Sequence, residues 1–371
     1  MTTRVLSVLF SLFFLILGLS HSPAVQAEPA MKRGANLAHW LQHKGTQPID
    51  KTDLKALHTA GFDHVRLPFD PMVLGWNPER PEELPLADKL RDAVDMILAS
   101  GLNIIFDMHP ENKFKLSLEK DPENVDALVR LWRKLAREYA GVPPNRLAFE
   151  LLNEPTFWSG GPKPWNVLVQ QLHAAVRENA PKHLILASTR KSGGVAYLKD
   201  LQPLKDPNVM YVIHLYQPHV FTHQGPKWSQ YSAISGVPFP ASKAGDAAKY
   251  IDPLAPSDKL ARAEKGFREY IDTDYGQAEM QEYLEIATEW AKKHNVRLIC
   301  NEFGVIAAHA DRDSRYRWIN DARVLFEKNN IGWTIWDYAA DFGITRTPNS
   351  RIGPRELDPA ALKALGLTKG S

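Results

Sequence analysis

Short apolar runs alternate with amphipathic stretches along nearly all of this sequence, and the alternation strongly restricts the possible folds. Runs apolar at consecutive positions, such as Val209–Leu215, are typical of parallel strands covered on both faces. The predicted strands are Arg33–Leu37, His64–Phe69, Asn103–His109, Leu147–Asn153, Leu184–Ser188, Val209–Tyr216, Arg297–Glu302 and Gly332–Tyr338. The predicted helices are about Ile49–Ala60, Leu86–Ser100, Pro122–Tyr139, Pro164–Asn179, Gln277–Lys293, Arg312–Asn329 and Pro359–Leu365.

Eight strand–helix units predict an α/β protein with a single (β/α)₈ barrel, the TIM-barrel fold. A doubly wound open sheet is the alternative, but a nucleotide-binding sheet of that kind normally carries a Gly-x-Gly-x-x-Gly turn, which this sequence lacks. The stretch Gln217–Gly276 after the sixth strand shows no clear strand and is rich in scattered aromatic residues. We expect it to form a long loop or a small subdomain.

The amino terminus has the pattern of a secretory signal peptide. Arg4 precedes the apolar run Val5–Leu19, and Val25-Gln26-Ala27 offers small residues at a cleavage site. We therefore expect residues 1–27 to be removed, leaving a catalytic domain of residues 28–371 in the periplasm or the medium. After cleavage no membrane association is expected, because the run is too short for a membrane span.

Charge and cysteine content exclude several classes of function. The chain has 45 Lys+Arg and 43 Asp+Glu, a net charge of +2, whereas a nucleic-acid-binding protein would need a basic excess. A single cysteine, Cys300, excludes an intrachain disulfide and a multi-cysteine zinc site. His214, His219 and His223 lack a matching set of carboxylates, so no metal or other cofactor is expected. We expect a monomer.

Polar residues gather where the predicted strands end, the face at which (β/α)₈ barrels carry their catalytic residues. Burying so many polar groups for stability alone would be costly, so a functional site is indicated. These residues are Asn36, Trp40, Arg66, Asp107, His109, Asn153, Glu154, His214, Tyr216, Glu302 and Trp336.

Glu154 and Glu302 form the central pair. Two carboxyl groups on different strands can divide the work of glycoside hydrolysis, one protonated as general acid and one ionised as nucleophile. Arg66 beside a carboxylate would keep it ionised. Glu150, four residues before Glu154 and expected on the same strand face, is interpreted as a structural partner of a buried base.

Together these motifs resemble those of glycoside hydrolase family 5, which includes the cellulases and related β-glycanases. The residues that carry the resemblance are Gly34-x-Asn36, Val65-Arg66-Leu67-Pro68, Asp107-x-His109, Leu152-Asn153-Glu154-Pro155, His214-x-Tyr216, Glu302-Phe303-Gly304 and Trp336. Two positions depart from the family pattern, because Pro110 follows His109 where many members have a second His, and Asn301 precedes Glu302 where many have Gly.

The resemblance implies a role for each matched residue. It implies that Glu154 is the acid/base and Glu302 the nucleophile of a retaining double displacement. It also implies that Arg66 and Tyr216 bind the nucleophile and that His214 contacts the acid/base. The sugar at subsite −1 would be bound by Asn153, by His109 and by stacking on Trp336.

The expected function is that of an endo-β-1,4-glucanase acting on a β-linked glucan or oligosaccharide. An exo-β-glucosidase, a β-1,3-glucanase or a β-mannanase with the same mechanism is the alternative. A sugar-binding barrel without activity and a metal-dependent barrel hydrolase are the other classes considered.

Overall fold

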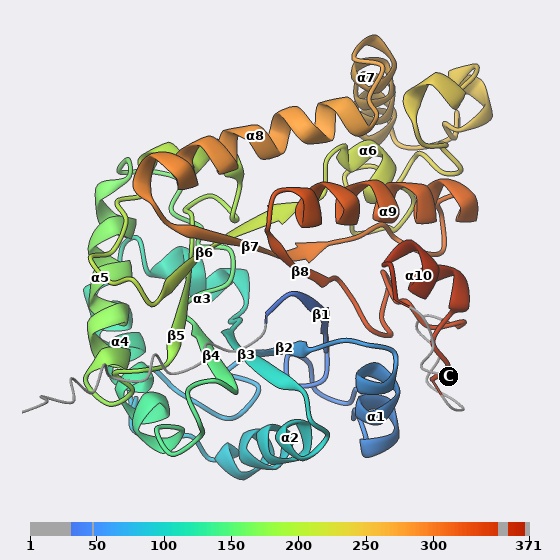
Figure 1. The fold of residues 1–371 in the computed structure, drawn as a ribbon. Helices are drawn as coiled ribbons and strands as arrows, with labels where there is room; N and C mark the ends of the chain where they lie inside the picture. Colours follow the sequence, from blue (N-terminus) through green and yellow to red (C-terminus); the bar gives the residue numbers. More distant parts are fainter. Residues whose placement is uncertain (1–30, 47, 348–354, 368–371) are drawn as a thin grey trace, which may run out of the picture.

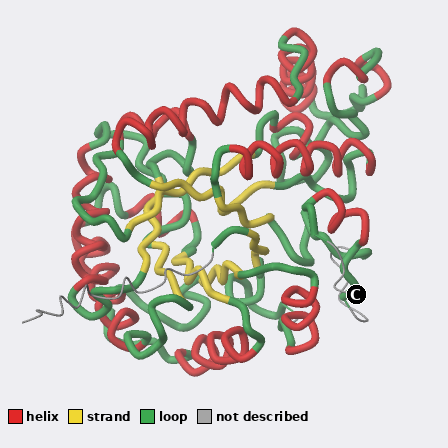
Figure 2. Tube along the Cα trace, in the orientation of Figure 1, coloured by secondary structure: helices red, strands yellow, loops and turns green. Residues whose placement is uncertain are grey.

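Eight parallel strands close into a barrel in the computed structural model, which describes residues 31–46, 48–347 and 355–367. The predicted signal peptide lies outside these residues. Each strand pairs with its sequence neighbours, and β1 pairs with β8 to close the ring (Figure 2). The strands are β1 (Arg33–Asn36), β2 (His64–Phe69), β3 (Asn103–Met108), β4 (Leu147–Glu150), β5 (Leu184–Ser188), β6 (Val209–Leu215), β7 (Arg297–Phe303) and β8 (Gly332–Ile335). The predicted (β/α)₈ barrel is therefore confirmed.

Helices surround this barrel and bury its outer surface (Figure 1). They are α1 (Lys51–Thr59), α2 (Ala87–Ala99), α3 (Asn112–Ser117), α4 (Pro122–Glu138), α5 (Lys163–Arg177), α6 (His219–Thr222), α7 (Ser257–Asp272), α8 (Gln277–His294), α9 (Arg312–Lys328) and α10 (Pro359–Ala364). Three short 3₁₀ helices join them: η1 (Val195–Asp200), η2 (Ala241–Lys243) and η3 (Ala247–Lys249). None of the helices in these ranges is both long and apolar enough to cross a membrane.

Helix α4 shows how the sequence builds these elements and braces the site. The Asp121 side chain accepts hydrogen bonds from the backbone N–H groups of Glu123 and Asn124, and Pro122 occupies the first turn, where no N–H is needed. The buried face of α4 carries Trp132, whose indole N–H donates to the Leu151 carbonyl at 2.9 Å. This bond anchors the segment that follows β4 and leads into Asn153-Glu154.

The barrel interior has an apolar half and a polar half. Near the amino ends of the strands, inward side chains form a small apolar cluster of Met31, Ile105, Ala148, Leu184, Leu186, Val212 and Ile299. Toward the carboxyl ends the interior is occupied by buried polar side chains, which the pairing register places side by side on adjacent strands. Asp107 is paired in register with Glu150, and His214 with Glu302.

The stretch 217–276 is a small subdomain with its own core, as one of the two alternatives predicted. Buried residues of this core include Val237, Phe267 and Tyr270. The segment contains α6 and α7 and projects from the barrel next to one end of α8 (Figure 1). The sequence prediction missed α7, which supplies Phe267 and Tyr270 to this core. Its low apolar content hid it, since only four of its residues are buried.

Five predicted strands end earlier than expected, among them β1, which ends at Asn36 and not at Leu37. Strand β4 ends at Glu150, so Asn153 and Glu154 lie in the loop beyond it, and the prediction that Glu150 and Glu154 share a strand face was wrong. His109, Tyr216 and Trp336 likewise come just after the last residue of their strands. The sequence remains apolar beyond these strand ends because the residues that follow, such as Leu151, Leu152 and Tyr338, are buried.

Candidate active site

A β-bulge in β7 places two consecutive polar side chains inside the barrel. Cys300 pairs with Ile213 and Glu302 pairs with His214, so Asn301 is an extra residue on β7. Regular strands send neighbouring side chains to opposite faces, and a bulge interrupts this alternation. As a result Asn301 and Glu302 both reach the polar interior, while Cys300 packs in the outer core, buried as expected.

Arg66 on β2 organises the buried carboxylates. Its Nε and Nη2 donate to the two oxygens of Glu150 at 2.7 and 2.8 Å, and its Nη1 donates to Glu302 Oε1 at 2.7 Å. Asp107 Oδ2 lies 2.9 Å from Nη2. This buried guanidinium gives all three carboxyl groups a positively charged partner, and its charge opposes the burial that raises the pKa of Asp107 to about 7. The predicted structural role of Glu150 is thus borne out by direct contact.

Glu302 is held at both oxygens. Besides the bond from Arg66 to Oε1, the Tyr216 hydroxyl donates to Oε2 at 3.0 Å. Burial, followed by the nearby Glu302 charge, raises the pKa of Tyr216 well above its usual value, so the hydroxyl remains a donor. Donors at both oxygens fix the Glu302 carboxyl group in one orientation, as a nucleophile requires.

Glu154 reaches the site from the loop after β4. Its backbone has φ of +42°, an uncommon conformation for a non-glycine residue. The side chain is 30% exposed, whereas that of Glu302 is 6% exposed. One carboxyl group therefore faces the open cavity and the other is enclosed, a difference in environment suited to different roles.

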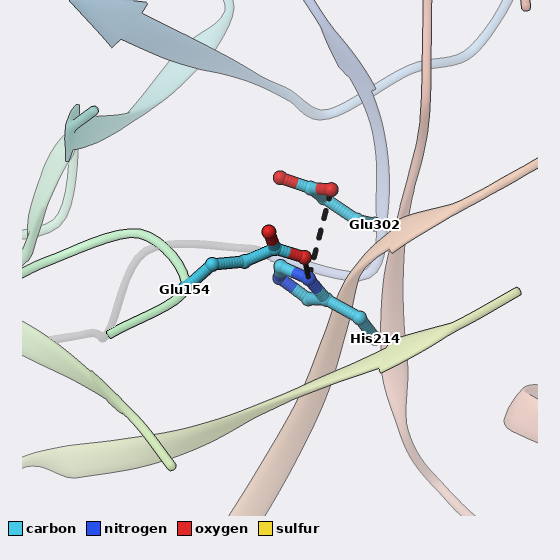
Figure 3. Close-up of side chains that lie close together, drawn as sticks. All are labelled: Glu154, His214 and Glu302. Atoms are coloured by element: carbon cyan, nitrogen blue, oxygen red, sulfur yellow. Dashed lines mark hydrogen bonds and ion pairs between the residues drawn. The ribbon is translucent and has the colours of Figure 1, made fainter. Parts of the chain in front are cut away.

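His214 lies between the two carboxyl groups (Figure 3). Its Nδ1 is 3.0 Å from Glu154 Oε1 and 3.6 Å from Glu302 Oε2. Burial lowers the pKa of His214, but the charges of Glu302 and Glu154 outweigh it and raise the pKa overall. Burial raises the pKa of Glu154, but the His214 hydrogen bond and the charges of His214 and Lys115 bring it to about 2. Both shifts favour a proton on His214 over a proton on Glu154.

A second chain of bonds orients Asn153. His109 Nδ1 lies 2.8 Å from the Asp107 carboxylate and so carries a proton, which leaves Nε2 as the acceptor for Asn153 Nδ2 at 3.0 Å. Burial, with repulsion from Arg66, lowers the pKa of His109 to about 3, so the ring is neutral. Arg66 donates to Asn153 Oδ1 at 2.9 Å. One amide hydrogen of Asn153 then remains for a ligand.

A cavity of about 530 Å³ opens beside Glu154. Trp336 lines it, with its ring stacked at 5.9 Å on the ring of His109. A methyl group at Gly304 would come within 2.2 Å of the Trp336 carbonyl oxygen, which explains glycine at that position. The complete lining is His39, Gln42, His43, Lys44, Asp70, Val73, His109, Pro110, Glu111, Asn112, Lys115, Asn153, Glu154 and Trp336.

The structure brings together ten of the eleven site residues predicted from sequence. Asn36 lies behind the site, accepting from Arg66 Nη1 at 3.0 Å and donating to the Asn301 carbonyl at 2.9 Å. Trp40 is the exception, because it lines a separate neighbouring cavity and not the one beside Glu154. The β1 loop turns so that His39 and Gln42, which were not predicted, face the site cavity instead.

Lys115 was also missed. Its side chain on α3 lines the cavity and is only 3% exposed. Within the described ranges its ammonium has no hydrogen-bond or ion-pair partner, and burial lowers its pKa. Sequence offers no signal for such a residue, since lysine on a short polar helix is nearly always exposed.

Glu154, His214 and Glu302 are the one group of potential metal ligands found in the described part of the chain, with their ligand atoms within 4.8 Å of one another. The hydrogen bonds from Arg66 and Tyr216 to Glu302 and the contact of His214 with Glu154 explain this cluster without a cation.

Comparison with known proteins gives a consistent relationship. The family model described as Cellulase (glycosyl hydrolase family 5) matches residues 25–341. Endoglucanase 3 of Fibrobacter succinogenes is 29% identical over 337 residues, covering 85% of this chain and 51% of that protein, so the chain spans about half of its length. Endoglucanase C of Acetivibrio thermocellus is 29% identical over 330 residues, covering 83% of this chain and 91% of that protein. A crystal structure of a hyperthermophilic endo-beta-1,4-glucanase in complex with substrate shares the fold, with a TM-score of 0.75 at 23% identity over 91% of this chain and 97% of that one.

Proposed function

Because the chain belongs to glycosyl hydrolase family 5 and is thus a glycoside hydrolase, we propose that it hydrolyses β-linked glucans with retention, using Glu154 as acid/base and Glu302 as nucleophile. The observation that carries this proposal is the geometry of the two carboxyl groups. One oxygen of Glu154 and one oxygen of Glu302 lie within 4.8 Å of each other. Retaining enzymes place these groups about 5 Å apart, whereas inverting enzymes leave about 6.5–9.5 Å for a water molecule.

In the first step Glu302 attacks the anomeric carbon and Glu154 donates a proton to the leaving oxygen. A glycosyl–Glu302 ester forms and the aglycone departs. In the second step Glu154 removes a proton from water, which attacks the anomeric carbon and releases Glu302. Arg66 and Tyr216 stabilise the Glu302 carboxylate before attack and as it leaves.

Before a sugar binds, the proton for the first step lies on His214. A bound sugar would displace water around the partly exposed Glu154. Desolvation disfavours the imidazolium–carboxylate pair, and the proton moves across the 3.0 Å contact from Nδ1 to Oε1. The active acid is therefore produced by substrate binding.

Asn153 supports binding of the sugar at subsite −1, because its free amide hydrogen can donate to a hydroxyl group. Trp336 offers a flat face to the same ring. These contacts suit a neutral pyranose and do not by themselves choose between glucose and mannose.

Endo action is supported by exposed indoles beyond the cavity. Trp158, four residues after Glu154, is 54% exposed, and Trp228 in the subdomain is 60% exposed. Trp228 contacts His223 edge-on at 5.9 Å, and His223 contacts Tyr216 at 5.1 Å. Aromatic faces on this side could stack sugars of the leaving chain, as an internal cut requires. Two curated relatives bear the name endoglucanase.

The test is product profiling on β-1,4-glucans, β-1,3-glucans, mannans and oligosaccharides, with Glu302→Gln and Glu154→Gln as matched isosteric controls. Internal cuts in β-1,4-glucan with β-configured products are expected, and both variants should fold but lose turnover. Single sugars from chain ends would favour the exo-β-glucosidase, and a different preferred polymer would favour the β-1,3-glucanase or β-mannanase. Normal turnover in either variant would refute the assignment of the two catalytic residues. Binding without hydrolysis by the wild type would indicate a sugar-binding barrel. Loss of activity with a chelator would indicate a metal-dependent enzyme.

We also propose that the protein is exported and that it is a monomer. The signal sequence supports cleavage before Glu28, leaving the domain 28–371 in the periplasm or medium. Mass spectrometry of the protein from a producing cell should give a mature amino terminus at residue 28, and light scattering should give the mass of one chain. An uncut amino terminus would contradict the cleavage.

A further inference from the structure

Asn301 is the residue that the bulge inserts into β7, and its side chain is completely buried. Its Nδ2 donates to Glu150 Oε2 at 2.7 Å, and its Oδ1 lies 3.1 Å from His214 Nε2. The Asn301 carbonyl also accepts from Asn36 at 2.9 Å. Main chain and side chain are thus both fixed, with the amide spanning the space between Glu150 and His214.

The orientation of this amide follows from its partners. Both Glu150 oxygens accept hydrogen bonds from Arg66, so the Glu150 carboxyl group acts as an acceptor toward its neighbours. The Asn301 atom facing it must therefore be the nitrogen, and the atom facing His214 must be the oxygen. Because that oxygen can only accept, the proton of the His214–Asn301 bond belongs to His214 Nε2.

We propose that Asn301 is a positioning residue that holds His214 as the Nε2–H tautomer and thereby keeps the acid proton in the hydrogen bond between His214 Nδ1 and Glu154. This inference rests on the proposed acid/base role of Glu154. It concerns a position at which the chain departs from the glycine that many family members carry.

Proton counting shows why the tautomer matters. When the only proton of His214 is on Nε2, its Nδ1 carries a lone pair. A hydrogen bond between Nδ1 and Glu154 then requires a second proton, carried either by Nδ1 or by the Glu154 carboxyl group. With the opposite tautomer, a neutral His214 donates from Nδ1 to an ionised Glu154, and the second proton is lost. The Asn301 acceptor stabilises the two-proton state, which is the one able to protonate a leaving group.

Charged groups face this pair from several elements. His214 is faced by Glu154, Glu302, Arg66 and Asp107. Glu154 is faced by His214, Lys115, His109, His219 and His223. Asn301 is neutral, so it adds nothing to this field. Its effect on the pH profile comes through the hydrogen bond that its side-chain oxygen accepts from His214.

The experiment compares pH profiles of kcat/KM for wild type, Asn301→Ala and Asn301→Asp. In Asn301→Ala the two-proton state loses its acceptor, so the alkaline limb should move to lower pH by about half a unit to one unit, the size expected for one neutral hydrogen bond. The carboxyl group introduced by Asn301→Asp keeps an acceptor facing His214, so its limb should lie at or above that of wild type.

Two controls separate positioning from general damage. Asn166→Ala removes another buried asparagine, which bonds the carbonyls of Pro162 and Asp200 outside the site, and should leave the limb in place. A dinitrophenyl glycoside needs no acid to expel its leaving group, so Asn301→Ala should shift the limb for a poor leaving group only. An unshifted limb, or equal losses on both substrates, would overturn the proposal.

Nitrogen NMR of the wild-type imidazoles gives a test that does not depend on turnover or on an Asn301 variant. The His214 signals are assigned by their absence in His214→Gln. As pH rises, Nδ1 should lose its proton while Nε2 remains protonated. Loss from Nε2 first would overturn the tautomer assignment even if the enzyme is active, and retention on Nε2 would support it even if the proposed reaction fails.

Discussion

Replacing Arg66 with methionine should destabilise the protein in a pH-dependent way. The substitution keeps most of the buried aliphatic volume but removes the one guanidinium that contacts Asp107, Glu150 and Glu302. Removing one partner of a buried ion pair typically costs about 3–5 kcal/mol of unfolding free energy, because the remaining charge stays buried. We expect a loss of this size near neutral pH.

The sign of the pH dependence follows from Asp107. Burial already raises its pKa to about 7, although Arg66 opposes the rise. A folded-state pKa above the unfolded value of about 4 stabilises the protein at low pH, and this contribution disappears as pH rises through the folded pKa. Without Arg66 the pKa of Asp107 rises further, so the loss continues to higher pH. Below about pH 7 Asp107 is protonated in both folded proteins and their stabilities change in parallel, so the difference in stability between variant and wild type should widen as pH rises above this value.

The assay is the melting temperature of both proteins at several pH values, with Arg146→Met as the matched control. Arg146 is partly buried, but its bonds go to the Asn103 side chain and to the backbone carbonyls of Leu98 and Leu102, not to carboxyl groups. Its loss should lower the melting temperature by a similar amount at every pH. If the difference in melting temperature between Arg66→Met and wild type is constant with pH and no larger than that of the control, the electrostatic reasoning is refuted.

Three further predictions concern the reaction. Tyr216→Phe should lower kcat/KM on an aryl glycoside by about 10–100-fold without loss of the fold, because it removes one bond to a charged carboxylate; an unchanged rate would argue against a role for Tyr216. Lys115→Met should move the alkaline limb of the pH profile of kcat/KM to higher pH, because the Lys115 charge helps to lower the pKa of Glu154. A limb that stays in place or moves to lower pH would contradict this. Trp228→Ala should raise KM for long oligosaccharides but not for an aryl monosaccharide, measured side by side; equal effects would rule out a platform for the leaving chain.

Much of the site could be predicted from sequence because barrel topology places the carboxyl ends of all strands on one face. Once eight strands were recognised, Arg66, His109, Glu154, His214 and Glu302 had to lie near that face, whatever their separation in sequence. The failures concern local geometry. Trp40 belongs to the same loop as His39, and only the path of that loop decides which of them reaches the cavity.

The sequence by itself determined the barrel, the family and the pair of carboxyl groups, because hydrophobic periodicity and motif order are properties of the chain alone. Only the tertiary structure decided how the polar interior is connected. The β7 bulge turns Asn301 inward beside Glu302, which regular alternation would have forbidden. The burial of Lys115 and the position of His214 between Glu154 and Glu302 likewise depend on contacts between distant elements. Such contacts set protonation, since a pKa reflects the groups that folding brings within a few ångströms.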